Sequence, residues 1–135
     1  MARGLSSSPI SLDQTDFLYR FLHRSSFNDD GTLNSSAFGL RSDPEASVGI
    51  AKSIPASSFE SFCLLKPGHG LAQFQVAEVT AANLGVLPQM DEAWGVFADA
   101  HAILTGYANW PNNRKTDAAR ALRDAANKGI LRRPS

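Results

Sequence analysis

The chain has 135 residues, enough for one hydrophobic core and too few for a second of ordinary size. Its 13 basic side chains balance its 13 acidic ones, so the charge excludes a global positive field that would attract nucleic acid or anionic membrane. A single cysteine, Cys63, excludes an internal disulfide and a Cys-x-x-Cys zinc or redox pair. Residues 1–10 hold no signal-peptide run, and no stretch of about 18 apolar residues occurs. These features predict a cytoplasmic domain without membrane contact.

The predicted organisation is a flexible N-terminal tail over residues 1–15, one domain over residues 16–131 and a C-terminal tail over residues 132–135. The first 15 residues are rich in serine and glycine and show no sustained apolar period. Such a segment does not bury enough apolar surface to offset the entropy lost on ordering.

Residues 17–23 are dense in aromatic and aliphatic side chains and are predicted to form a strand. The two alternating sets are Phe17, Tyr19 and Phe21 against Leu18, Arg20 and Leu22. A helix that begins at Asp13 or Thr15 stays the alternative, because a short apolar run also fits spacings of four residues.

Turn residues and breaks divide the next segment. Asn and Asp followed by glycine at 28–31 predict a reversal of the chain. Residues 33–40 fit a short strand or a loop, and Asp43-Pro44-Glu45 marks a break before an extended segment at 47–51.

The middle of the chain predicts a helix from Pro55 to about Leu65, a strand over 71–76 and a short helix from Val76 to Leu84. Gly85 is predicted to end that helix in the left-handed conformation.

Further strands are predicted at 86–87 and 101–105, separated by the segment 88–99. Alanine and leucine recur at helical spacing over Thr116–Lys128, which predicts a helix closed by Gly129, with 130–131 packed back on the core. The expected fold class is α+β: a single small domain with a mixed or antiparallel sheet and two or three packed helices.

Arg20 is the first candidate for a binding residue, because its neighbours are large and apolar and an unpaired buried charge is costly. In one interpretation, the Arg20 guanidinium has an internal partner, for which Asp29, Asp30 and Glu45 are candidates, or it extends into the solvent. The other makes it a fork for a phosphate, a carboxylate or a nucleobase.

Histidines and serines supply the other candidates. His23 and His101 lie at predicted strand ends and suit either a structural hydrogen bond or proton transfer near neutral pH. His69 fits an exposed turn, and the three histidines lack a metal-ligand spacing. Ser35 and Ser36 follow the predicted turn without a G-x-S-x-G motif, so capping or ligand hydrogen bonding is favoured over nucleophilic catalysis.

Two further features concern cofactors and partners. No phosphate-binding or dinucleotide motif occurs, so the cofactor stays unknown, and Cys63 fits an inert core thiol. The C-terminal quarter is locally basic, which favours a solvated helix face and leaves a weak local contact with nucleic acid or an acidic partner as the alternative. The basic residues are Arg114, Lys115, Arg120, Arg123, Lys128, Arg132 and Arg133.

The motifs Tyr19-Arg20 with His23, Ser35-Ser36-Ala37-Phe38 and His101-Ala102-Ile103 resemble those of a family of small uncharacterised bacterial proteins with Y-R-x-x-H, S-S-x-A-F and H-A-I elements. The likeness covers residues 18–131 and implies one domain with a shared pocket. The residues it points to are Arg20, His23, Ser35, Ser36 and His101. Two departures are Arg24, where the family commonly has proline, and Asp91-Glu92-Ala93-Trp94 in place of a D-P pair.

A looser likeness concerns ADP-ribosyltransferase-like toxins. Leu-Tyr-Arg on a first strand, ahead of hydroxyl residues on a later one, is similar to their opening, in which an arginine holds the dinucleotide. That family also implies a late catalytic glutamate, for which Glu78 and Glu92 are the available residues.

The leading functional prediction is a ligand- or partner-binding domain of a small bacterial accessory system, of the toxin–antitoxin or phage-defence kind. Arg20 would hold a small anionic ligand or nucleotide, and His23, Ser35 and His101 would complete its hydrogen bonds. One alternative is an enzyme that processes a nucleotide or NAD. The other is a protein-binding module with an exposed aromatic patch made of Trp94, Phe97, Tyr107 and Trp110.

Overall fold

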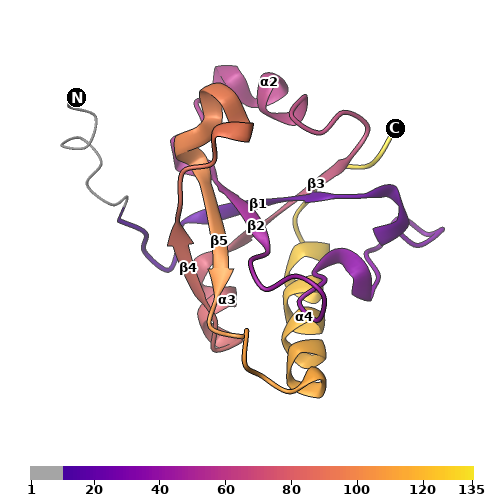
Figure 1. The fold of residues 1–135 in the computed structure, drawn as a ribbon. Helices are drawn as coiled ribbons and strands as arrows, with labels where there is room; N and C mark the ends of the chain where they lie inside the picture. Colours follow the sequence, from indigo (N-terminus) through magenta and orange to yellow (C-terminus); the bar gives the residue numbers. More distant parts are fainter. Residues whose placement is uncertain (1–10) are drawn as a thin grey trace.

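The computed structural model describes residues 11–135, and most of the predicted N-terminal tail, residues 1–10, lies outside the described residues. Six strands form one sheet in the order β4-β5-β2-β1-β3-β6, and every neighbouring pair is antiparallel (Figure 1). The strands are β1 (Phe17–Leu22), β2 (Ser47–Ile50), β3 (Gly70–Gln75), β4 (Gly85–Pro88), β5 (His101–Thr105) and β6 (Ile130–Arg132). The predicted α+β fold, one small domain with an antiparallel sheet, is confirmed.

Helical segments connect these strands. The α-helices are α2 (Phe59–Cys63), α3 (Val76–Ala81) and α4 (Asn112–Asn127), and the 3-10 segments are η1 (Arg24–Ser26), η2 (Ser35–Ala37), η3 (Ala51–Ser53), η4 (Ala56–Ser58) and η5 (Glu92–Ala100). No helix among residues 11–135 is long and apolar enough to cross a membrane.

One face of the sheet packs against α3, α4 and η2. The alanines of α4 and the buried Leu122 lie on aliphatic side chains of β1, β2, β3 and β5, as the helical spacing predicts. The helix begins at Asn112, four residues before the predicted start at Thr116. Pro111 precedes its first turn, and its fixed φ suits a helix entry.

The opposite face packs against α2 and η5 through aromatic rings. Phe62 of α2 stacks on Phe21 of β1 at 5.0 Å between ring centroids, and it meets Trp94 and Phe97 of η5 edge to face at 5.5 and 5.4 Å. Such offset and edge-to-face contacts add to the free energy gained by burial. The predicted strand over 17–23 is confirmed as β1, with Leu18 and Leu22 in the first core and Tyr19 and Phe21 packed against the second.

Four local predictions differ from the structure. Residues 35–37 of the predicted strand or loop at 33–40 form the 3-10 turn η2, because Asn34 accepts a hydrogen bond from the Ser36 N–H. The positive φ after α3 falls on Asn83, at 63°, and Gly85 instead opens β4. The helix predicted from Pro55 is divided into η4 and α2. Arg132, predicted to belong to the C-terminal tail, ends strand β6.

Strands β1 and β2 separate along their length. β1 pairs with β3 at every position from Phe17 to Leu22, whereas it pairs with β2 only at Leu18↔Ile50 and Tyr19↔Gly49. The same register, if continued, would place Arg20 opposite Val48, but the ladder ends before that position. The candidate site lies at this β1–β2 separation. Arg20 borders it on β1, and Ser47 and Val48 border it on β2.

Candidate functional site

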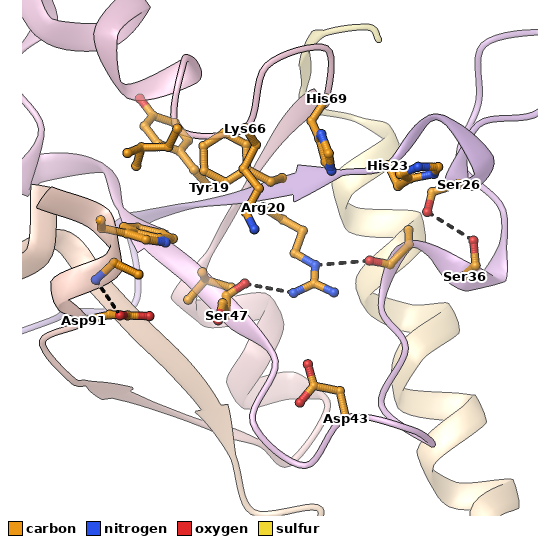
Figure 2. Close-up of a pocket in the computed structure, with 16 residues that line it drawn as sticks. Tyr19, Arg20, His23, Ser26, Ser36, Asp43, Ser47, Lys66, His69 and Asp91 are labelled. Atoms are coloured by element: carbon orange, nitrogen blue, oxygen red, sulfur yellow. Dashed lines mark hydrogen bonds between the residues drawn. The ribbon is translucent and has the colours of Figure 1, made fainter.

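A cavity of about 440 Å³ opens beside the β1–β2 separation. Figure 2 shows that its lining side chains come from both strands, from η2 and η5 and from the turn after α2. The residues that line it are Tyr19, Arg20, Phe21, His23, Ser26, Ser36, Ala37, Asp43, Ser47, Val48, Leu65, Lys66, His69, Asp91, Ala93 and Trp94. Polar and charged side chains therefore share one space with aromatic ones.

The guanidinium of Arg20 is held by main-chain carbonyl groups. Its Nε donates to the carbonyl oxygen of Ala37 at 3.1 Å, and its Nη1 donates to that of Ser47 at 2.9 Å (Figure 2). The Phe38 ring lies 5.3 Å from the guanidinium carbon. Two of the five N–H donors of the guanidinium are thus used within the protein, and three remain. The group is fixed in position before any ligand arrives.

The charge of Arg20 has no close counter-ion among the described residues. No carboxylate of residues 11–135 forms a salt bridge with it, and its predicted internal partners, Asp29, Asp30 and Glu45, do not contact it. Burial lowers the pKa of Arg20, and the charge of Asp43 acts in the opposite direction. The guanidinium stays protonated at neutral pH. It is therefore a partly desolvated cation with unused donors.

Asp43 lies on the side of the cavity that faces Arg20 in Figure 2. Its Oδ1 accepts the N–H of Glu45, which fixes the turn that leads into β2. The buried Tyr107 holds the same turn, because its hydroxyl donates to the Asp43 carbonyl at 2.7 Å and accepts the Ala46 N–H at 2.9 Å. The 43–46 segment is therefore tied to the core close to the cavity.

His23, Ser26 and Ser36 form the end of the cavity next to η1 and η2. The Nδ1 of His23 accepts the Ser25 N–H at 3.0 Å, so the neutral ring carries its proton on Nε2. Ser36 donates to Asn34 at 2.7 Å, and its oxygen lies 3.1 Å from that of Ser26. The Ser26 hydroxyl is therefore the donor of that pair. Both serine protons are used within the protein, which leaves oxygen lone pairs for a ligand.

Lys66 and His69 reach the cavity from the turn after α2. In Figure 2 the Lys66 ammonium and the His69 ring point down toward the space beside Arg20. The His69 ring meets the His23 ring edge to face at 5.5 Å. No carboxylate of the described residues forms a salt bridge with Lys66. These side chains add a second cation and two titratable rings to the surroundings of Arg20.

His101 lies behind the cavity wall, and its ring is almost fully buried, with 4% exposed. Its Nε2 is 3.0 Å from the hydroxyl oxygen of Ser47 and 3.7 Å from the Asp91 carboxylate, and its Nδ1 is 2.7 Å from the Gln89 carbonyl oxygen. Trp94 contacts the ring edge to face at 4.7 Å. Only Ser47, Asp91 and Trp94 of this group line the cavity.

The structure brings together three of the five predicted site residues, Arg20, His23 and Ser36, in the lining of one cavity. Ser35 lies elsewhere, in a smaller cavity beside Phe38 and α4. His101 does not line the main cavity and is connected to it through Ser47, Asp91 and Trp94. Each of these assignments as a ligand-binding residue stays a prediction.

Several residues of the site were not expected from the sequence. His69 was predicted to be an exposed turn residue, yet it is half-buried and lines the cavity. Ser47 and Lys66 carry no local motif. Only Ser47 had a sequence feature that could have indicated a site residue. It is a polar residue at the start of the predicted extended segment, where a loop meets a strand, and loops beside regular elements often carry binding residues.

The remaining candidates do not gather at this cavity. Glu78 and Glu92, the late glutamates that an ADP-ribosyltransferase likeness would need, do not line it. Three aromatic residues of the predicted exposed patch, Trp94, Phe97 and Tyr107, are buried, so that patch is not formed.

The basic C-terminal quarter is partly engaged within the protein. Arg114 stacks on Trp110 at 3.7 Å, Arg123 pairs with Asp124 at 2.9 Å, and Arg132 pairs with Glu60 at 2.6 Å. No group of three or more potential ligands among the described residues could hold a metal ion.

Comparison of the chain with models of protein families, with curated proteins and with solved structures finds no match. The chemistry of the cavity is therefore the basis for a functional proposal.

Proposed function

We propose that the chain binds a small anionic ligand, a carboxylate or a phosphate compound, through Arg20. The observation that carries the proposal is the state of this guanidinium. It is half-buried, fixed by the Ala37 and Ser47 carbonyl groups, without a salt bridge to the described residues, and it lines a cavity of ligand size. A ligand anion would supply the missing counter-charge and accept the unused N–H donors.

The surroundings of Arg20 support a ligand that is more than an inorganic ion. Lys66 provides a second cation for an anionic group, and Ser26 and Ser36 provide hydrogen-bond acceptors for ligand hydroxyl or amine groups. Tyr19, Phe21 and Trp94 provide apolar wall on the opposite side of the sheet. A hydroxylated or aromatic carboxylate and a nucleotide both fit this combination.

The cellular setting remains part of the proposal. Cys63 is a free, buried thiol, and burial raises its pKa, which fits an unreactive cysteine in a reducing cytoplasm. Membership of a bacterial toxin–antitoxin or phage-defence system stays a prediction, as does catalysis on a nucleotide or NAD.

A thermal-shift screen tests the proposal, because a ligand that binds only the folded state raises the melting temperature. The panel contains inorganic phosphate, succinate, citrate, nucleotides, NAD and ADP-ribose. We expect at least one anion to stabilise the wild-type chain and the Arg120→Ala variant, whose lost cation lies on the exposed side of α4.

The matched variant at the site is Arg20→Lys, which keeps the positive charge but loses the planar fork. We expect its affinity for the stabilising anion to fall roughly tenfold, the effect of a lost charge-assisted hydrogen bond of about 1.4 kcal/mol. The proposal is wrong if no anion of the panel stabilises the wild-type chain, or if Arg20→Lys binds as tightly as Arg120→Ala.

A further inference from the structure

The pair formed by Ser47 and His101 has the geometry of an activated hydroxyl group. β2 pairs with β5 at Gly49↔His101 and Ser47↔Ile103, so Ser47 and His101 are diagonal neighbours on one face of the sheet. The Nε2 of His101 lies 3.0 Å from the Ser47 Oγ. This separation is the hydrogen-bond distance that a nucleophile and its base require.

The partners of His101 define its proton arrangement. The Gln89 carbonyl oxygen only accepts hydrogen bonds, so Nδ1 carries the proton at its 2.7 Å contact. In the neutral ring, Nε2 then has a free lone pair, and it accepts the proton of the Ser47 hydroxyl. Asp91 places a carboxylate oxygen 3.7 Å from the same Nε2, where it would stabilise the imidazolium formed by proton transfer.

Asp91 is itself held in place. Its Oδ1 accepts the Ala93 N–H at 2.9 Å and caps the start of η5, which leaves Oδ2 toward His101. The Trp94 ring, one residue farther along the chain, contacts the imidazole edge to face. Both ring nitrogens and one edge of His101 are therefore positioned by neighbours, as a general base requires.

A reactant can reach Ser47 but not His101 directly. Ser47 lines the cavity, whereas His101 is buried behind it. The carbonyl oxygen of Ser47 also accepts a hydrogen bond from Arg20 Nη1 at 2.9 Å. The guanidinium is therefore bound to the same residue that carries the hydroxyl group. Ser26 and Ser36 line the cavity as well, but they hydrogen-bond each other and Asn34 and contact no base.

We propose that Ser47 is a nucleophile activated by His101 and that the chain hydrolyses carboxylic esters that bear an anionic group. The preference for an anionic ester rests on the proposed function of Arg20, whereas the activation of Ser47 does not. Gln89 and Asp91 act as positioning residues.

In the first step the Ser47 oxygen bonds to the ester carbonyl carbon, the carbonyl electron pair moves to its oxygen, and the hydroxyl proton passes to His101 Nε2. The electron pair on that oxygen then re-forms the carbonyl group as the bond to the leaving alkoxide breaks, and the alkoxide takes the proton from His101 Nε2 to leave as an alcohol. Water repeats the sequence on the acyl group, which releases a carboxylic acid and restores the Ser47 hydroxyl and the neutral His101.

A fluorophosphonate probe tests the activation of Ser47 without knowledge of the substrate. The serine oxygen displaces fluoride at phosphorus, and the proton passes to His101, so a stable phosphonyl–serine ester forms. Intact mass and peptide mapping of the folded wild-type chain are expected to show one adduct, on Ser47. Ser57→Ala, which changes an exposed serine of η4, should label like the wild-type chain, and Ser47→Ala should lose the adduct.

Two further variants test the role of His101. His101→Gln offers a hydrogen-bond acceptor without basicity, and its labelling should slow about a hundredfold or more. Asp91→Asn keeps the oxygen that accepts the Ala93 N–H and removes the negative charge, so it should label more slowly than the wild-type chain while it stays folded. Circular dichroism checks the fold of each variant.

The inference is overturned if the folded wild-type chain carries no adduct on Ser47, or if Ser47 and Ser57 label at equal rates. This comparison needs no variant, so misfolding of His101→Gln would not rescue the inference. Equal labelling of folded His101→Gln and wild-type chain would also overturn it.

The substrate preference is tested with 4-nitrophenyl acetate and mono-4-nitrophenyl succinate, which differ in the anionic group of the acyl chain. We expect faster release of nitrophenol from the succinate, with the preference reduced in Arg20→Lys. Ser47 labelling without a preference for the anionic ester would reject the anionic-substrate part and count against the proposed function, while leaving the Ser47–His101 pair standing. Anion binding at Arg20 without labelling of Ser47 would support the proposed function and overturn the inference about Ser47 and His101.

Discussion

One face of the sheet is covered by a sixteen-residue helix, α4, together with α3, and its buried side chains form a core that is mainly aliphatic. The other face is covered by α2, five residues long, and by the 3-10 segment η5, and it is packed largely by aromatic rings. The cavity borders this second face. A long helix with an unbroken apolar stripe can cover a sheet face completely, whereas short segments leave space beside it. The aliphatic face therefore accounts for stability, whereas the cavity lies where the β1–β2 ladder ends, between η2 on the aliphatic side and η5 on the aromatic side.

The largest expected effect is on the aliphatic face. Leu122→Ala removes a side chain with no exposed surface from the middle of α4, and we expect a loss of about 3 to 5 kcal/mol in the free energy of unfolding. Urea denaturation measures it. The matched control, Leu64→Ala, changes a leucine that is 68% exposed and should cost no more than about 0.5 kcal/mol. Equal losses for the two variants would contradict the contrast between core and surface.

Tyr107→Phe tests the boundary between the aliphatic core and the site, where the Tyr107 hydroxyl holds the 43–46 turn. The substitution leaves the Ala46 N–H and the Asp43 carbonyl without their hydroxyl partner, and we expect a loss of about 1 to 3 kcal/mol in unfolding free energy. Tyr19→Phe is the control, since no described residue hydrogen-bonds the Tyr19 hydroxyl. A Tyr107→Phe variant as stable as Tyr19→Phe would show that the 43–46 turn does not depend on this tyrosine.

Alkaline pH tests the same tyrosine without changing its shape. Burial raises the pKa of Tyr107 above its ordinary value of 10.0. A group with a raised pKa in the folded state contributes stability that is present below the unfolded pKa and lost as the pH rises toward the folded pKa. The unfolding free energy of the wild-type chain should therefore fall above about pH 10. The fall should be smaller in Tyr107→Phe, and parallel pH curves for the two proteins would contradict it.

The smallest expected effect concerns Asp43, whose charge competes with a ligand anion. Asp43→Asn keeps the oxygen that accepts the Glu45 N–H and removes the negative charge near Arg20. We expect the affinity for a stabilising anion to rise about two- to fivefold, or roughly 0.4 to 1 kcal/mol. Asp29→Asn, an exposed carboxylate outside the cavity, should leave the affinity unchanged. Isothermal titration calorimetry compares them, and weaker binding by Asp43→Asn would mean that the carboxylate itself contacts the ligand.

Elements with a clear period could be predicted from the sequence. The alternation around Arg20 predicted β1, and the alanine and leucine spacing predicted α4, because each pattern reflects one buried face of one element. The start of α4 was placed late, since the polar first turn around Asn112 carries no apolar signal. The left-handed residue at Asn83 was assigned to Gly85, because glycine is the commoner choice and asparagine also tolerates positive φ.

The site could be predicted only in part, because it is made by contacts between distant segments. Arg20 attracted notice as a charge in an apolar strand, but its carbonyl partners belong to η2 and β2, which no local pattern links to it. Ser47 lies 54 residues from His101 in the sequence, so their contact exists only through the β2–β5 pairing. The separation of β1 from β2 depends on where a ladder ends, which sequence periodicity does not encode.

The most direct test of the central claim is a nitrogen-15 NMR titration of the Arg20 Nε–H group with inorganic phosphate and with succinate. The hydrogen bond to Ala37 should slow exchange of this proton with water enough to make its signal visible. We expect at least one of the two anions to shift the signal in a saturable way, with no matching change at the Nε–H of Arg123, which donates to Asp124 outside the cavity. An Arg20 signal that stays unchanged, or that moves no more than the Arg123 signal, would contradict an anion site at Arg20.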